Sequence, residues 1–369
     1  MTQRLALRAL NTIVDREADL KKKIVLLLSV CLAISVLGGC SPKNTETMNK
    51  AQQALDEGDY ENAAVYYSAA IEEGSQLQAC YRGKGIALMG KMEYESAEEA
   101  FNKALDSATF IEKRLYHDGM EDDIRRYLAS CYIKSGEPQK AILIYNALID
   151  KNDEDKYLFV ARGTAKAASG DLQSAKTDFD KAINMDRGNY ELILEIAQIM
   201  ARYGAKNVGE GYLAGTGSVE GMDPVLKGKI LYFLEDYKGA VNLLSQFSET
   251  DETAALIMCR CYIALDDTEA AKGVIDSFGS KADSSAVLLG LLGSILMKQH
   301  KFSEAVEVYE RAVNAAKGTP DLQNTLYNRI VAYEYTGDFE KARDLLTEYL
   351  KQYSGDEEAK REMRFLKTR

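Results

Sequence analysis

Tryptophan, histidine and proline are the residue types that this sequence lacks or nearly lacks. Its 369 residues include no tryptophan, four prolines and two histidines, which are far apart at His117 and His300. Two distant histidines predict neither a histidine metal site nor a histidine-centred catalytic triad. A sugar site built on stacked tryptophans is excluded as well. We therefore expect no catalytic residue, no metal site and no cofactor.

Cysteine is present, but its spacing does not predict a disulfide framework. Two of the six cysteines fall within the first 40 residues. Further along, Cys259 and Cys261 are two residues apart, so on a helix they point away from each other and cannot form the usual metal-binding pair. We expect these two, together with Cys80 and Cys131, to be small buried residues.

Acidic residues outnumber basic ones by 57 to 46, which gives a formal net charge of −11 at pH 7. A chain with this balance is poorly suited to nucleic acid, so we expect no nucleic-acid partner. The last ten residues are the exception, because five of them are basic and only Glu362 is acidic. We interpret residues 357–369 as a helix that caps the C-terminus, with a basic docking patch as the alternative.

One pattern recurs along most of the chain. In residues 159–183, Gly163 lies within a first helix, Gly170 and Asp171 form a turn, and Ala175 and Phe179 share one face of a second helix. The small residue of the first helix recurs as Ala51, Gly85, Ala129, Gly163, Ala197, Gly228, Cys259, Gly293 and, as the exception, Ile330. The small residue after the turn recurs as Ala63, Ala97, Ala141, Ala175, Gly209, Ala240, Ala271, Ala305 and Ala342. A large apolar residue follows four positions later, as Tyr67, Phe101, Tyr145, Phe179, Leu213, Leu244, Ile275, Tyr309 and Leu346.

A period near 34 residues with this small, small, large pattern resembles the tetratricopeptide repeat. The resemblance covers about residues 44–356. It implies an all-α fold, a right-handed α-solenoid of about nine stacked helical hairpins in one elongated unit. The unit at residues 190–220 is the most degenerate, because glycines crowd its second half. We expect a short or frayed helix there, as either a plain degenerate repeat or a hinge.

Residues 1–39 have the features of a leader and a bacterial lipoprotein signal peptide. A run of lysines at 21–23 precedes an apolar run at 24–37 that is shorter than the roughly 20 residues needed to span a bilayer. The sequence Leu-Gly-Gly-Cys at 37–40 resembles a lipobox, which implies lipidation, for example with palmitate, at Cys40. Residues 40–43 would then be a lipidated tether.

This signal predicts a protein held by Cys40 on the extracytoplasmic face of a bacterial membrane. The alternative is an uncleaved signal anchor. Because residues 20–40 form a complete signal by themselves, we hypothesise that translation begins at codon 20.

The resemblance also implies a concave face, lined by the first helices, that takes an extended peptide or a partner helix. Aromatic and cationic side chains at those positions would supply contact area and hold acidic groups. The expected partner-binding residues are Arg82, Arg126, Tyr157, Arg202, Lys229, Tyr232, Arg260, Tyr327 and Tyr335. We expect a scaffold or adaptor for proteins at the cell envelope, and not an enzyme. The alternative is an extracytoplasmic solute- or glycan-binding lipoprotein.

Overall fold

The computed structural model describes residues 42–74, 76–107, 119–216 and 219–369. Within these ranges all regular secondary structure is helical. None of the helices in these ranges is long and apolar enough to cross a membrane. The leader, the apolar run, Cys40 and His117 lie outside the described residues, so the lipoprotein prediction stays a prediction.

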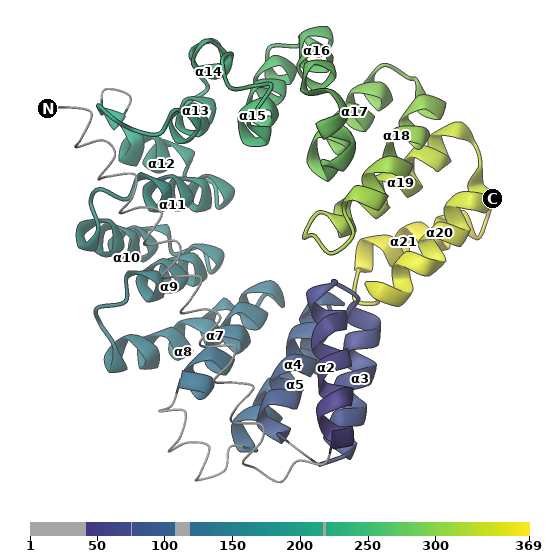
Figure 1. Ribbon diagram of the computed structural model, residues 1–369. Coiled ribbons are helices and arrows are strands. Elements are labelled where there is room, and N and C mark those ends of the chain that lie inside the picture. Colours follow the sequence, from purple (N-terminus) through teal and green to yellow (C-terminus); the bar gives the residue numbers. More distant parts are fainter. Residues whose placement is uncertain (1–41, 75, 108–118, 217–218) are drawn as a thin grey trace, which may run out of the picture.

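Nineteen α-helices in the described ranges form nine antiparallel hairpins and one final helix (Figure 1). The first helices of the hairpins are α2 (Pro42–Asp56), α4 (Leu77–Gly90), α7 (Gly119–Lys134), α9 (Lys156–Ala168), α11 (Tyr190–Arg202), α13 (Pro224–Phe233), α15 (Glu252–Ala264), α17 (Ala286–Lys298) and α19 (Leu322–Thr336). The second helices are α3 (Tyr60–Glu72), α5 (Tyr94–Asp106), α8 (Pro138–Lys151), α10 (Leu172–Met185), α12 (Lys206–Leu213), α14 (Tyr237–Leu244), α16 (Thr268–Phe278), α18 (Phe302–Ala315) and α20 (Phe339–Gln352). A 3₁₀ segment, η2 (Gly279–Ser284), follows α16, and α21 (Glu357–Leu366) ends the chain. The predicted all-α hairpin architecture and the C-terminal capping helix are confirmed.

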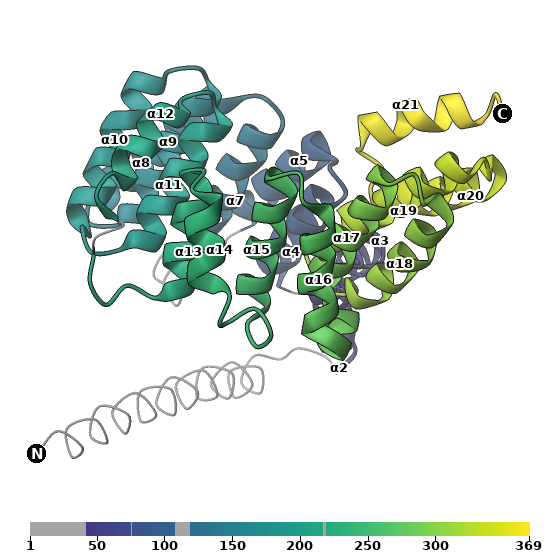
Figure 2. The ribbon, with the colours of Figure 1, turned by 90° about the horizontal axis from the view of Figure 1, so that it is seen from above.

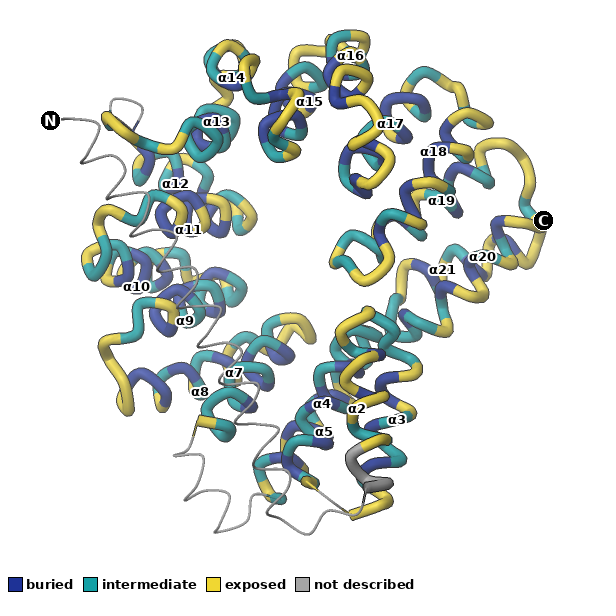
Figure 3. Tube along the Cα trace, viewed as in Figure 1, coloured by how far each residue is buried: buried dark blue, intermediate teal, exposed yellow. Residues whose placement is uncertain are grey.

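Four hairpins have a close contact between a glycine of the first helix and a large residue of the second. A Cβ atom added at Gly85 would lie 2.5 Å from the ring of Phe101, and one at Gly163 would lie 2.6 Å from the ring of Phe179. The large residue therefore packs on the small position of its own hairpin. The ring of Tyr67 on α3 also lies against Gly83 on α4, in the next hairpin. Figure 3 shows buried positions where helices face one another and exposed positions at many turns.

Every hairpin turn contains a residue in the left-handed backbone region. Five of these residues are glycines: Gly58, Gly136, Gly170, Gly204 and Gly337. The other four are Met92, Glu235, Asp266 and His300, with φ between 60° and 63°. A left-handed residue costs about 1–2 kcal/mol when it has a side chain, so the turn shape is retained in these four units against a local penalty. His300 is thus a turn residue.

The fifth and sixth hairpins contain the shortest helices. Helices α12 and α14 have 8 residues each and α13 has 10. A Cβ at Gly209 would lie 2.6 Å from the carbonyl oxygen of Ala197, so α11 and α12 approach more closely than an alanine in this position would allow. The predicted short helix is confirmed.

The stack of hairpins does not stay open and elongated, because its two ends meet and close a ring (Figure 1). The turn after α20 lies on the turns of the first two hairpins. Gly355 N–H donates to the carbonyl oxygen of Lys91 at 2.8 Å, and the Gln352 side chain donates to the carbonyl oxygen of Gly58 at 2.7 Å. Ser354 also donates to the carboxylate of Glu93.

A line of tyrosines crosses the closing contact. The ring centroids of Tyr60 and Tyr353 are 6.3 Å apart, those of Tyr353 and Tyr349 are 4.8 Å apart, and those of Tyr349 and Tyr327 are 5.7 Å apart. Tyr353 and Tyr349 are almost fully buried. Aromatic pairs at these distances stabilise a contact beyond the area that they bury. The contact between the ends therefore has an apolar centre as well as backbone hydrogen bonds.

Helix α21 covers the last hairpin and lies along one rim of the ring (Figure 2). Ala359, Met363 and Leu366 are its buried residues. Beside it, one carboxylate oxygen of Glu334 on α19 is buried and has no hydrogen-bond partner in the part of the chain that the structure describes. Burial, and then the neighbouring Glu362 carboxyl of α21, raise the pKa of Glu334 to about 7.

We expect Gly355→Ala to open the ring. Its Cβ would lie 2.1 Å from the carbonyl oxygen of Met92, which is backbone and cannot move aside without breaking the contact. Small-angle scattering should show a larger radius of gyration with unchanged helical circular dichroism. Gly273→Ala is the matched control, because nothing lies within 4 Å of its added Cβ. An unchanged radius of gyration in Gly355→Ala would show that the ring does not depend on this contact.

We also expect the docking of α21 to depend on pH. The docked state retains a proton on Glu334 that the undocked state, with an ordinary pKa of 4.5, releases. Docking is therefore fully favoured below about pH 4.5 and weakens as the pH rises through about 7. Hydrogen-exchange protection factors of residues 357–366 should fall between pH 5.5 and pH 8 in the wild type and stay constant in Glu334→Gln. The exposed Glu348→Gln variant should behave like the wild type, and equal pH dependence in all three proteins would contradict the role of Glu334.

Candidate functional site

The first helices of the hairpins line the inner side of the ring, and the second helices lie on its outer side (Figure 1). All nine predicted partner-binding residues are on first helices, from Arg82 on α4 to Tyr335 on α19. Some of these nine residues make contacts that hold the fold together, and the others remain available for a ligand.

Two of the predicted cations join one hairpin to the next. The Arg82 side chain donates to the Asp123 carboxylate, and its guanidinium lies 5.0 Å from the centroid of the Tyr127 ring. Arg126 donates to Asp155 at 2.9 Å. Asp155 also caps α9 by accepting from its backbone. A ligand could use either arginine only by competing with these contacts.

The predicted tyrosines at the C-terminal end differ in exposure. Tyr327 packs on Tyr349, and burial together with the nearby Glu358 raises the pKa of its phenol to about 12. Tyr335 is 61% exposed, and its ring centroid is 5.1 Å from that of Phe302. It lines a hollow of about 400 Å³ with His300 and other side chains of α17, α18 and α19.

Tyr157 and Arg202 lie on the inner helices α9 and α11 without neighbours from the predicted set. Tyr157 is 54% exposed, and Lys156 lies 5.1 Å from its ring centroid. Arg202 is exposed in the last turn of α11, where a cation favourably faces the negative end of the helix dipole.

The structure brings the other three predicted residues together. Lys229, Tyr232 and Arg260 line a hollow of about 330 Å³ formed by α11, α13 and α15, which we call the inner groove. The complete lining is Glu191, Leu194, Glu195, Gln198, Leu226, Lys229, Tyr232, Thr253, Leu256, Ile257 and Arg260. Because these residues recur at i, i+3 or i+4, and i+7 in α11 and α15, each helix presents a single stripe to the groove.

Charge in the inner groove is divided between its walls. Glu191 and Glu195 lie on α11, whereas Lys229 lies on α13 and Arg260 on α15. None of the four has an ion-pair partner within the described ranges, although ion pairs are common elsewhere on the inner helices. For comparison, Arg162 on α9 donates to the buried Asp178 at 2.6 Å and 2.8 Å.

Helix dipoles do not account for these charges. Of the four, only Glu191 lies in the first turn of its helix, where an acidic side chain is stabilised by the positive helix end. Glu195 is mid-helix, and neither Lys229 nor Arg260 is in a last turn. The mid-helix charges are therefore available for a ligand.

The acidic wall is the part of the site that sequence reasoning missed. Glu191 and Glu195 occupy the same inward stripe of α11 that the repeat pattern assigns to the concave face. Their position in the repeat is the signal that could have identified them, because it places acidic side chains on the concave face in the same way as cations and aromatic residues.

The remaining chemistry-bearing groups are structural. Cys80, Cys131, Cys259 and Cys261 are buried, as predicted. Burial raises the pKa of the Cys259 thiol to about 12, and that of the other three to about 11, so the reactive thiolate is scarce near neutral pH. No cluster of metal-ligating side chains is present among the residues that the structure describes.

Comparisons with known proteins agree with this architecture. Models of the tetratricopeptide repeat match residues 48–110, 83–156 and 283–354. The chain is 22% identical over 275 residues to anaphase-promoting complex subunit 3 of Schizosaccharomyces pombe, a match that covers 66% of this chain and 41% of that protein. The chain thus spans less than half the length of this curated relative.

The chain is also similar to solved structures. The crystal structure of yeast Tom70 is matched with a TM-score of 0.49 and 14% identity, over 88% of this chain and 81% of that one. A tetratricopeptide repeat protein from Parabacteroides merdae is matched with a TM-score of 0.40 and 17% identity, over 79% of this chain and all of that one.

The division between structural and available cations predicts different effects on stability. Arg82→Ala should lower the free energy of unfolding by about 1–2 kcal/mol, because it removes an ion pair and a cation–π contact between hairpins. Arg202→Ala, which removes the same charge from a site without such contacts, should change it by less than about 0.5 kcal/mol. Urea denaturation followed by circular dichroism measures both. Equal losses would contradict the distinction.

Proposed function

We propose that this chain, whose residues 48–156 and 283–354 match models of the tetratricopeptide repeat, is a non-enzymatic scaffold that binds protein or peptide partners on its inner face. The inner groove is the proposed contact site. The observation that carries this proposal is the set of charged side chains in the groove that have no ion-pair partner in the described residues.

The composition of the inner groove suits a peptide partner. Leu194, Leu226, Leu256 and Ile257 provide an apolar lining, and Tyr232 and Arg260 belong to the residue types that most often dominate binding energy at interfaces. A volume of about 330 Å³ accommodates a few side chains of an extended segment, whereas a folded domain would need a broader surface.

The charges strengthen this assignment through the cost of desolvation. Binding that buries Lys229 or Arg260 is favourable only if the partner supplies an acceptor, because an unpaired buried charge is strongly destabilising. Arg82 and Arg126 already have acidic partners within the chain. A ligand gains new charge-assisted hydrogen bonds in the inner groove without first breaking an internal pair.

We further propose that the protein acts at the cell envelope, held by a lipid on Cys40. The support is the signal-like sequence of residues 21–40. The first described helix begins at Pro42, so the first hairpin would remain close to the anchored residue. An assembly role is in keeping with the curated relative, which is named as a subunit of a complex.

Affinity capture from detergent-solubilised native membranes tests both parts of the proposal. We expect the wild-type protein to retain a specific partner that the Lys229→Glu, Tyr232→Ala, Arg260→Glu triple variant loses. Lys238→Glu is the matched control, because it reverses an exposed charge on α14, on the outer side of the ring. Cys40→Ala should leave capture by purified protein unchanged but shift the protein from the membrane fraction to the soluble fraction of cells. Equal capture by wild type and triple variant would rule out the groove, and unchanged membrane association of Cys40→Ala would rule out the anchor.

A further inference from the structure

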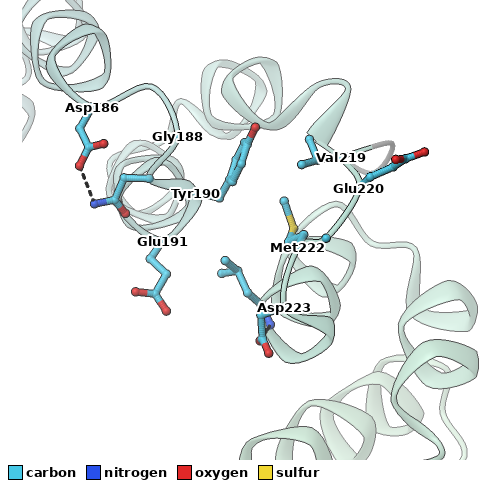
Figure 4. A pocket seen from close by; sticks show the side chains of 11 residues that line it. Asp186, Gly188, Tyr190, Glu191, Val219, Glu220, Met222 and Asp223 are labelled. Atoms are coloured by element: carbon cyan, nitrogen blue, oxygen red, sulfur yellow. Dashed lines mark hydrogen bonds between the residues drawn. The ribbon is translucent and has the colours of Figure 1, made fainter. Parts of the chain in front are cut away.

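The inner groove continues into a second hollow at the edge of the ring. This edge pocket has a volume of about 550 Å³ and lies between the turn before α11 and the segment before α13 (Figure 4). Its lining is Asp186, Gly188, Asn189, Tyr190, Glu191, Val219, Glu220, Gly221, Met222, Asp223 and Leu226. Glu191 and Leu226 line both hollows, so the two form one continuous surface.

The edge pocket extends the acidic wall of the groove. Figure 4 shows Tyr190 and Met222 near its centre and the carboxylates of Asp186, Glu220 and Asp223 around its rim. Asp186 pairs with Lys156 at 2.8 Å, and Asp223 caps α13.

Glu191 and Glu220 differ from those two carboxylates. Both are exposed and have no ion-pair partner in the described residues. None of the described residues that line the edge pocket is basic. The continuous surface is thus acidic at the α11 end and basic at the end formed by Lys229 and Arg260.

From this polarity we propose that the partner segment is an extended peptide that carries both a basic side chain and a carboxylate. The basic side chain lies toward Glu191, Glu195 and Glu220, and the carboxylate lies toward Lys229 and Arg260. An apolar or aromatic residue between them packs on Leu194, Leu226 and Tyr232. This specificity rests on the proposed function of the inner groove.

The spacing between the two charges follows from the packing of the helices. Packed helices lie about 8–10 Å apart. An extended peptide advances about 3.3 Å per residue, so it crosses from the acidic wall on α11 to the first basic side chain on α13 in about three residues. A peptide of uniform charge would leave one wall facing a like charge, which weakens binding.

Fluorescence anisotropy with four labelled hexapeptides tests the inference. The amphoteric probe is Lys-Lys-Leu-Tyr-Glu-Glu. The single-charge probes are Lys-Lys-Leu-Tyr-Gln-Gln and Gln-Gln-Leu-Tyr-Glu-Glu, and Lys-Glu-Leu-Tyr-Glu-Lys keeps the composition but rearranges the charges. We expect the amphoteric probe to bind about tenfold more tightly than each of the others, because each of them lacks or misplaces one charge-assisted contact. Free-acid and amidated forms distinguish a terminal carboxylate from a side-chain carboxylate.

Charge reversal separates a direct contact from a structural effect. The Lys229→Glu, Arg260→Glu variant should bind the amphoteric probe about tenfold more weakly and should prefer Lys-Lys-Leu-Tyr-Lys-Lys. Lys238→Glu, which reverses an exposed charge on the outer helix α14, should bind like the wild type. Equal binding of the amphoteric and rearranged probes, or no change of preference on charge reversal, would overturn the inference.

The outcomes also separate this inference from the function on which it rests. If no hexapeptide binds while the triple variant still loses its partner in the capture experiment, the peptide chemistry is wrong and the scaffold function stands. If capture is unaffected as well, both are wrong.

Discussion

The whole structure depends on the close contact between a small residue of one helix and a large residue of its partner. At Gly85 and Phe101, and again at Gly163 and Phe179, a single added carbon would overlap the ring. This contact fixes how closely the two helices of a hairpin approach, and therefore the angle at which the next hairpin is added. Over nine hairpins the array turns until its ends meet.

The inner face illustrates how one kind of side chain serves two purposes in a repeat protein. Arg82 and Arg126 pair with acids on the neighbouring hairpin and hold the stack together. Lys229 and Arg260 occupy comparable inward positions but form no ion pair in the described part of the chain. The difference is whether the neighbouring hairpin supplies an acid, and it does not lie in the arginine or lysine itself. A binding surface of this kind is therefore recognised by charged side chains that form no ion pair within the chain.

Much of the fold was predictable from the sequence, because the three recurring positions, two small and one large, are the positions where the helices of a hairpin contact each other. The turns were predictable only where glycine marks them, since Met92 and His300 adopt the same left-handed conformation without any sequence signal. The site was half predictable: position within the repeat identified Lys229 and Arg260, but the acids that pair with Arg82 and Arg126 are 41 and 29 residues away. Ring closure was not predictable, because it depends on small rotations summed over all nine hairpins.

Closure also changes how the chain can fold. In an open array each end unit has one neighbour and frays first, whereas here the turn at Gly355 supports the first two hairpins from the far end of the sequence. Among the hydrogen bonds of the described residues, the one from Gln352 to Gly58 in this closing contact has the highest sequence separation, 294 residues. The entropy of joining the ends must be lost before this contact forms, so it forms late. During synthesis the first two hairpins therefore lack this support until residues 352–355 have been made.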